Sequence, residues 1–133
     1  MSNNKKIYSF LNSNGFELLE KDTSAYFGDY YAIFSNNVFQ LRFSSSKSIE
    51  TVDIRNNWPE ESWYDLALVK ALLHSEANLG LDITVDEYNN FLQTELTDVA
   101  TLFSDAHYLR TKKKLNELGS ERVKQMFPNI NSE

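Results

Sequence analysis

Residues 26–55 read YFGDYYAIFSNNVFQLRFSSSKSIETVDIR and contain three runs in which apolar and polar residues alternate. Alternation with a period of two predicts strands that bury one face and expose the other. We expect strands over residues 25–35, 38–43 and 49–55, joined by short polar connections. The first connection, Asn36-Asn37, predicts a two-residue hairpin turn, because asparagine tolerates a positive φ. The stretch therefore predicts the centre of an antiparallel sheet.

The hairpin turn also predicts which residues face each other across the sheet. Val52 and Ile54 extend the apolar face, whereas Thr51, Asp53 and Arg55 take the opposite, mixed face. Counting outward from the turn pairs Phe34 with Phe39, Ala32 with Leu41, Tyr30 with Phe43, Ile33 with Gln40 and Tyr31 with Arg42. We therefore expect one face of the sheet in the core and the other in solvent.

The segment before this stretch predicts a short helix and a first strand. Ile7, Phe10 and Leu11 have helical spacing, and Asn14-Gly15 is typical of a helix end, since glycine adopts the left-handed conformation readily. Residues 16–22 alternate imperfectly and predict one more strand. We therefore expect a sheet of about four strands.

The residues after the sheet predict two to four helices. Pro59 is typical of a first helical turn and begins a helix that we expect over residues 62–78, with Trp63 in its buried stripe. Residues 84–87 (TVDE) have the spacing of a capping box before a second helix. Beyond that helix we expect more helix, with a break at Gly119-Ser120. The order of elements predicts an α+β fold: a short N-terminal helix, an antiparallel sheet of about four strands, and helices packed on one sheet face.

Length and composition predict one domain in a reducing compartment. A chain of 133 residues with 41% hydrophobic residues can bury one core. We expect a single domain over residues 1–128 and a disordered tail over 129–133. The absence of cysteine and of any long apolar run favours a cytoplasmic protein without membrane contact.

The formal net charge of -6 is unevenly distributed along the chain. Residues 48–105 carry twelve acids against two bases, whereas residues 106–133 carry six bases against three acids. An acidic chain repels nucleic acid and anionic lipid and favours a basic partner. We therefore expect another protein as the partner.

The patterns that catalysis or metal binding requires are missing from the sequence. His74 and His107 lie far apart, and neither has a second histidine four residues away, so we expect both at the surface or at helix ends. The pairs Glu60-Glu61 and Asp86-Glu87 stand at predicted helix starts, where the helix dipole explains them. No nucleophile elbow or glycine-rich phosphate loop occurs in a chain with 4 glycines. We expect no enzymatic activity, no cofactor and no metal.

The mixed face of the sheet is the candidate binding surface. Tyrosine and arginine among polar neighbours are typical of protein interfaces. Trp58 and Trp63 flank the acidic turn and are candidate anchors, although the helical pattern favours the core for Trp63. The structural alternative is that cross-strand pairs only stabilise an exposed sheet, or that a later helix covers this face. The candidate partner-binding residues are Asp29, Tyr31, Arg42, Asp53, Arg55, Trp58, Glu60 and Glu61.

Four segments together carry a resemblance to a known group of proteins: residues 26–34 (YFGDYYAIF), 39–43 (FQLRF), 49–54 (IETVDI) and 63–69 (WYDLALV). Over about residues 26–73 the chain resembles small bacterial immunity proteins of polymorphic toxin systems. The resemblance implies a cytoplasmic, non-enzymatic protein that binds and blocks a cognate toxin. The acidic residues 48–105 would suit a basic toxin domain through charge steering.

Other functions stay open at this point, as does the choice between a monomer and a homodimer. A secretion-type chaperone is also small, acidic and α+β, and it would bind an effector segment at a sheet edge or in apolar grooves. An enzyme with an unrecognised site would need a buried, shifted carboxylate. A regulatory nucleic-acid-binding protein would use the basic C-terminal segment, which we expect to be a solvated helix face. Its basic residues are Arg110, Lys112, Lys113, Lys114, Arg122 and Lys124.

Overall fold

The computed structural model describes residues 2–22, 29–46, 49–79 and 83–127, with side chains from residue 5 onward. The described chain forms an N-terminal helix, a five-stranded antiparallel sheet and three further helices, so the predicted α+β fold is confirmed. The elements are α1 (Ser2–Ser13), β1 (Glu17–Asp22), β2 (Tyr30–Ser35), β3 (Phe39–Ser46), β4 (Ile49–Asn56), β5 (Tyr64–Asp65), α2 (Leu66–His74), α3 (Val85–Phe103) and α4 (Tyr108–Met126).

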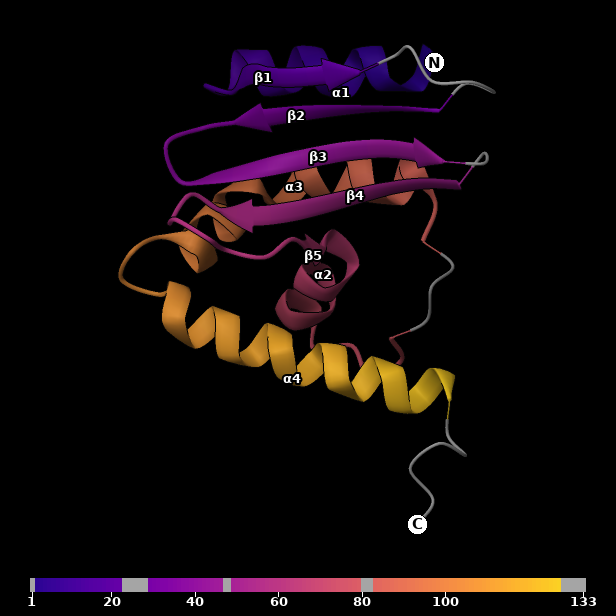
Figure 1. Ribbon diagram of the computed structural model, residues 1–133, viewed down its shortest axis with the longest axis vertical. Helices are drawn as coiled ribbons and strands as arrows, with labels where there is room; N and C mark the ends of the chain where they lie inside the picture. The colour runs from indigo at the N-terminus through magenta and orange to yellow at the C-terminus, as the bar shows by residue number, and fades with distance from the viewer. Residues whose placement is uncertain (1, 23–28, 47–48, 80–82, 128–133) are drawn as a thin grey trace.

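The helices occupy one side of the sheet and one of its edges. Figure 1 shows α1 and α3 behind the strands, and α2 between the strands and α4. The sheet face toward the viewer in Figure 1 carries no described helix. None of the described helices combines the length and the apolar character that crossing a membrane requires. The layered arrangement therefore leaves one face of the sheet open among the described residues.

The five strands follow the order β1-β2-β3-β4-β5, and every neighbouring pair is antiparallel. The prediction of about four strands missed β5, which has only two residues and pairs Ile54 with Tyr64. Val52 and Ile54 face the core opposite Phe43 and Leu41, as predicted. The alternation along β3 and β4 therefore produces the expected apolar face.

The predicted register of the first hairpin is wrong by two residues. The structure pairs Tyr30 with Ser45, Tyr31 with Ser44, Ala32 with Phe43, Ile33 with Arg42 and Phe34 with Leu41. The turn is closed by Asn36, whose Oδ1 accepts the N–H groups of Val38 at 2.7 Å and Phe39 at 2.8 Å, and neither asparagine of the turn has a positive φ. Because side chains alternate with a period of two, a shift of two residues leaves every residue on its predicted face.

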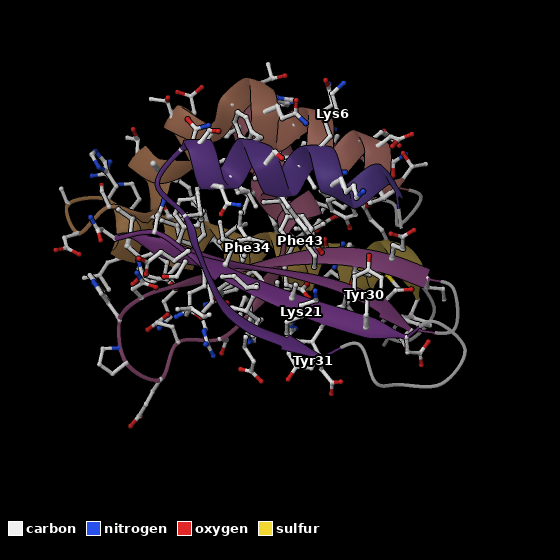
Figure 2. The ribbon with its side chains drawn as sticks, turned by 90° about the horizontal axis from the view of Figure 1, so that it is seen from above. Lys6, Lys21, Tyr30, Tyr31, Phe34 and Phe43 are labelled. Atoms are coloured by element: carbon white, nitrogen blue, oxygen red, sulfur yellow. The ribbon has the colours of Figure 1, made fainter. Side chains whose placement is uncertain are left out.

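The core lies between the inner face of the sheet and the helices. The ring of Phe39 meets Phe16 at 5.5 Å and Phe103 at 5.8 Å between centroids, so it joins the start of β1 to the end of α3. Figure 2 shows Phe34 and Phe43 between the sheet and α1. Burial of these aromatic rings supplies much of the area that stabilises a chain of this size.

The first helix after the sheet begins later than predicted. Pro59 lies in a turn with Glu60, whose φ is 61°, and α2 begins only at Leu66. Asp65 caps this helix, because its Oδ1 accepts the N–H of Ala67 at 2.9 Å. The prediction of a helix over residues 62–78 is therefore wrong at both ends. The capping box at residues 84–87 is confirmed at the start of α3.

The predicted break at Gly119-Ser120 is also wrong, because α4 continues through both residues to Met126. A methyl group at Gly119 would lie 3.9 Å from Leu68 Cδ1, which is an ordinary packing distance. Gly15 differs, since its φ of 86° belongs to the left-handed region that ends α1 as predicted. The predictions for residues 25–28 and for the tail over 129–133 lie outside the described residues.

We expect Gly119→Ala to stabilise the protein by about 0.5–1 kcal/mol, because alanine is the better helix former and the site has room for its methyl group. The matched change Gly15→Ala should destabilise by at least about 1 kcal/mol, because a side chain is strained at that φ. Chemical denaturation of both variants measures the two effects. Destabilisation by Gly119→Ala would show that the space beside Leu68 is too small for a methyl group.

Candidate protein-binding face

The face of the sheet that the helices leave open is called the outer face here. Figure 2 shows Tyr31 on the side of the sheet away from α1. Strand residues of this face are half-buried and alternate with core residues in β2, β3 and β4. The outer face consists of Tyr31, Ile33, Gln40, Arg42, Asp53 and Arg55 from the strands, together with Trp63, which precedes β5.

Trp63 joins two arginines on the outer face instead of lying in the core. The guanidinium carbons of Arg42 and Arg55 lie 4.4 Å and 4.3 Å from the centroid of its ring. Each contact of this kind contributes about 0.5–1 kcal/mol at an exposed site. The prediction that Trp63 belongs to a buried helix stripe is wrong, because this half-buried residue precedes β5 and α2 begins only at Leu66. The three side chains form an ordered aromatic and cationic surface.

Polar contacts hold the two arginines in different ways. Arg42 Nη2 donates to Asp53 Oδ2 at 2.9 Å, which forms an ion pair between neighbouring strands. Arg55 Nη2 donates to Gln40 Oε1 at 2.8 Å, a neutral partner. Burial raises the pKa of Asp53 above its ordinary value even though Arg42 acts in the opposite direction. The ionised carboxylate is therefore less favourable in this setting than in water.

A groove on the outer face lies beside this cluster. It has a volume of about 310 Å³ and is lined by Glu20, Tyr31, Ile33, Arg42 and Ser44. The Tyr31 hydroxyl donates to the Glu20 carboxylate, and this hydrogen bond raises the pKa of Tyr31. The groove offers an apolar wall, a phenol and a guanidinium to a side chain of a partner.

The structure brings together half of the predicted partner-binding residues. Tyr31, Arg42, Asp53 and Arg55 share the outer face. Asp29 stands two residues before Tyr31 and is half-buried. Sequence reasoning favoured a core position for Trp63 and left it out of the predicted partner-binding residues. Trp63 stands two residues before Asp65, which pairs with Asp53 of β4. This pairing places Trp63 beside the outer face, and it cannot be seen in the sequence alone.

The remaining predicted residues lie at α4 rather than on the outer face. Trp58 packs edge-on against Tyr108 with 5.1 Å between centroids, and its Nε1 donates to Asp105 Oδ1 at 2.9 Å. Glu61 accepts hydrogen bonds from the Tyr108 hydroxyl and from Lys112 Nζ, the latter at 3.0 Å. Trp58 and Glu61 therefore anchor the start of α4, whereas Glu60 is exposed in the preceding turn.

The two histidines lie at helix ends, as predicted. His74 is the last residue of α2, and its Nε2 lies 2.6 Å from Glu95 Oε2. Its Nδ1 lies 3.4 Å from Glu76 Oε2. The two side chains meet because the helix ends at His74 and the chain turns back at Ser75, whose φ is 54°. No group of three metal-binding side chains occurs in the described ranges.

Glu61 provides a pH-dependent contribution to stability. The Tyr108 hydroxyl, followed by Lys112, lowers the pKa of Glu61 below its ordinary value of 4.5. A carboxylate with a lowered pKa in the folded state stabilises the fold above its ordinary pKa, and this contribution is lost as the pH falls through the folded value. Glu61 therefore supports the docking of α4 at neutral pH.

We expect Glu61→Gln to lower the free energy of unfolding by about 1–3 kcal/mol at pH 7. The difference from the unmodified protein should shrink as the pH falls from 4.5 toward the lower pKa of the folded state, because Glu61 of the unfolded chain then binds a proton before Glu61 of the folded protein does. Urea denaturation between pH 3 and pH 7 measures this, with the exposed neighbour Glu60→Gln as the control. A difference that is constant over this range would contradict the role of the ionised carboxylate.

Comparison of the chain with protein-family models, curated proteins and solved structures gives no match. The functional argument therefore depends on the geometry of the site. The outer face combines an ordered aromatic residue, two arginines and a shallow groove on a rigid sheet. Such a surface can bind another protein without any change of covalent bonds.

Proposed function

We propose that the protein is a non-enzymatic acidic binding module of the immunity type, which binds a cognate toxin through its outer face and neutralises it. The observation that carries this proposal is the contact of Trp63 with Arg42 and Arg55 on the open face of the sheet. Tryptophan, tyrosine and arginine are the residues most enriched among those that dominate binding energy at protein interfaces. All three types occur together on this face.

The state of these side chains before binding also supports the proposal. An ordered side chain loses less conformational freedom on association, at a saving of about 0.5–1.5 kcal/mol for each long side chain. Arg42 is held by Asp53, and Arg55 is held by Gln40. Both guanidinium groups are therefore already held in place before a partner binds. The guanidinium of Arg55 forms no ion pair with a described residue and remains available to a carboxylate of the partner.

The negative charge acts separately from this contact surface. Much of it lies on α3, where Asp86, Glu87 and Asp98 are exposed. A basic toxin would be attracted by this field over a distance of about 8 Å, the screening length at physiological ionic strength. Because α3 lies behind the strands (Figure 1), this attraction would favour encounter in general, and the outer face alone would supply the short-range contacts that orient the toxin.

A secretion-type chaperone is the second candidate, and strand β1 is the observation that favours it. All six residues of β1 are exposed, and in the described sheet β1 pairs only with β2. An open edge can accept an extended segment of another protein by main-chain pairing. The register irregularity between Leu18 and Glu20 argues against a long added strand, because bulges interrupt such pairing.

The test requires a toxin domain encoded by a neighbouring gene, with binding measured by calorimetry and neutralisation measured by growth on co-expression; a neighbourhood that encodes no toxin would contradict the proposal. We expect Arg55→Glu and Trp63→Ala each to weaken binding by about 10-fold or more, because both remove a contact at the centre of the face. The control Lys6→Glu makes the same charge change on α1, on the side away from the outer face (Figure 2). It should leave affinity within about 2-fold.

Thermal unfolding of each variant separates lost contacts from lost folding. Unchanged affinity of both outer-face variants, with the protein still folded, would contradict the proposal. A loss of affinity in Leu18→Glu on β1, with no loss in Arg55→Glu, would instead favour the chaperone function and pairing at the sheet edge.

A further inference from the structure

The basic residues of α4 fall into two groups with different surroundings. Lys112 Nζ pairs with Glu61 Oε2 at 3.0 Å, and Arg122 Nη1 pairs with Asp65 Oδ2 at 3.1 Å. These two cations hold α4 against the preceding segment. The others form no ion pair with a described residue. The unpaired cations are Arg110, Lys113, Lys114 and Lys124.

Arg110 and Lys114 flank a groove where α2, α3 and α4 meet. The groove has a volume of about 240 Å³. Its apolar floor is formed by Leu72 and Leu73 from α2 and Leu102 from α3, all half-buried. Its rim includes Arg110 and Lys114, which stand four residues apart and therefore on one face of the helix. The groove thus combines apolar side chains with two cations at one edge.

Two polar groups near the floor already have partners. Thr111 Oγ1 donates to the Leu102 carbonyl at 2.7 Å, so it offers little to a ligand. His107, also on the rim, has its Nδ1 3.0 Å from Ser104 Oγ. Only its Nε2 faces no described partner. The charged hydrogen-bond donors that remain at the groove are therefore those of Arg110 and Lys114.

We propose that this groove binds an amphiphilic carboxylate, with the alkyl chain on the leucines and the carboxylate at Arg110 and Lys114. Burial of apolar surface contributes about 25 cal/mol per Å², and a guanidinium binds a carboxylate in a well-matched pair. The volume is below the roughly 300–1,000 Å³ of typical ligand pockets, so the chain must be short. This site is separate from the outer face and does not depend on the proposed function.

The local charges favour a carboxylate over a nucleic acid. Glu117 lies one helical turn after Lys114, and Asp98 lies one turn before Leu102, yet neither forms an ion pair with the rim cations. These acids would oppose a long polyanion that extends beyond the groove. The leucine floor contributes nothing to a phosphate backbone. A compact anion with an apolar tail uses both features of the site.

The probe is octanoate, titrated into the full chain and followed by amide chemical shifts in ¹H–¹⁵N spectra. We expect saturable shifts in the residues of the groove, and no comparable shifts with inorganic phosphate. The neutral analogue 1-octanol should bind at least about 10-fold more weakly, because it lacks the charge that pairs with the cations. The double variant Arg110→Glu/Lys114→Glu should weaken octanoate binding by at least about 10-fold.

The control is Lys113→Glu, an exposed cation of the same helix outside the groove. It should leave octanoate binding within about 2-fold, because only the general charge changes. All the substituted cations are exposed and unpaired, so the variants are expected to fold, and circular dichroism checks this.

Equal binding of octanol and octanoate, or equal loss in Lys113→Glu, would overturn the proposal. So would tighter binding of a peptide with a free C-terminal leucine than of octanoate, because the occupant would then be a chain terminus. Stronger binding of a single-stranded oligonucleotide, in competition with octanoate, would also overturn it and assign the cations to phosphate contacts.

Discussion

The antiparallel pairing of β3 with β4 determines the chemistry of both faces of the sheet. The same ladder places Leu41 opposite Ile54 in the core and Arg42 opposite Asp53 on the half-buried outer face. A slip of one residue would exchange these sets, placing the ion pair in the core and the aliphatic side chains outside. The cost of burying a charged pair and losing apolar burial excludes that register. The outer face is therefore as firmly specified as the core.

The second organising feature is the polar attachment of α4. This helix buries Tyr108, Thr111 and Leu115, and it also makes several hydrogen bonds and ion pairs with earlier residues. Tyr64 and Gln125 add further bonds, to Asn116 and to the backbone at residues 77 and 79. Two of the acids in the acidic region over residues 48–105, Glu61 and Asp65, therefore pair with cations of α4. These acids stabilise the fold, and their charge is not available to a partner.

The sequence predicted correctly those features that depend only on residues close together in the chain. The alternation in residues 30–55, the capping box at Thr84 and the left-handed Gly15 each depend on residues close in sequence, and all three are confirmed. The hairpin register failed because the Asn36 side chain, rather than a positive φ, closes the turn. Nothing in the local sequence distinguishes these two uses of asparagine.

Features that depend on distant residues could not be predicted in this way. Trp63 has the spacing of a helix stripe, but pairing of β5 with β4 holds it on the outer face. Glycine is common at helix ends, but Gly119 lies inside α4, where the helix packs beside Leu68 of α2 and continues to Met126. The groove between α2, α3 and α4 combines segments about thirty to forty residues apart, so no single motif encodes it. In each case a tertiary contact outweighs a local preference.

One polar group of the outer face is buried without a hydrogen-bond partner in the described part of the chain, as is Asn89 Oδ1 in α3. Arg42 Nε is buried and has no hydrogen-bond partner among the described residues. Burial also raises the pKa of Asp53, so its charged form is disfavoured by folding. A surface selected only for stability would replace such a pair with apolar or fully solvated residues. Local departures from the rules of good packing concentrate at functional positions, where a side chain serves a contact outside the fold. The Arg42–Asp53 pair, with its unpartnered Nε, lies on the same face as Trp63 and Arg55, and this proximity links the energetics of the sheet to the proposed binding surface.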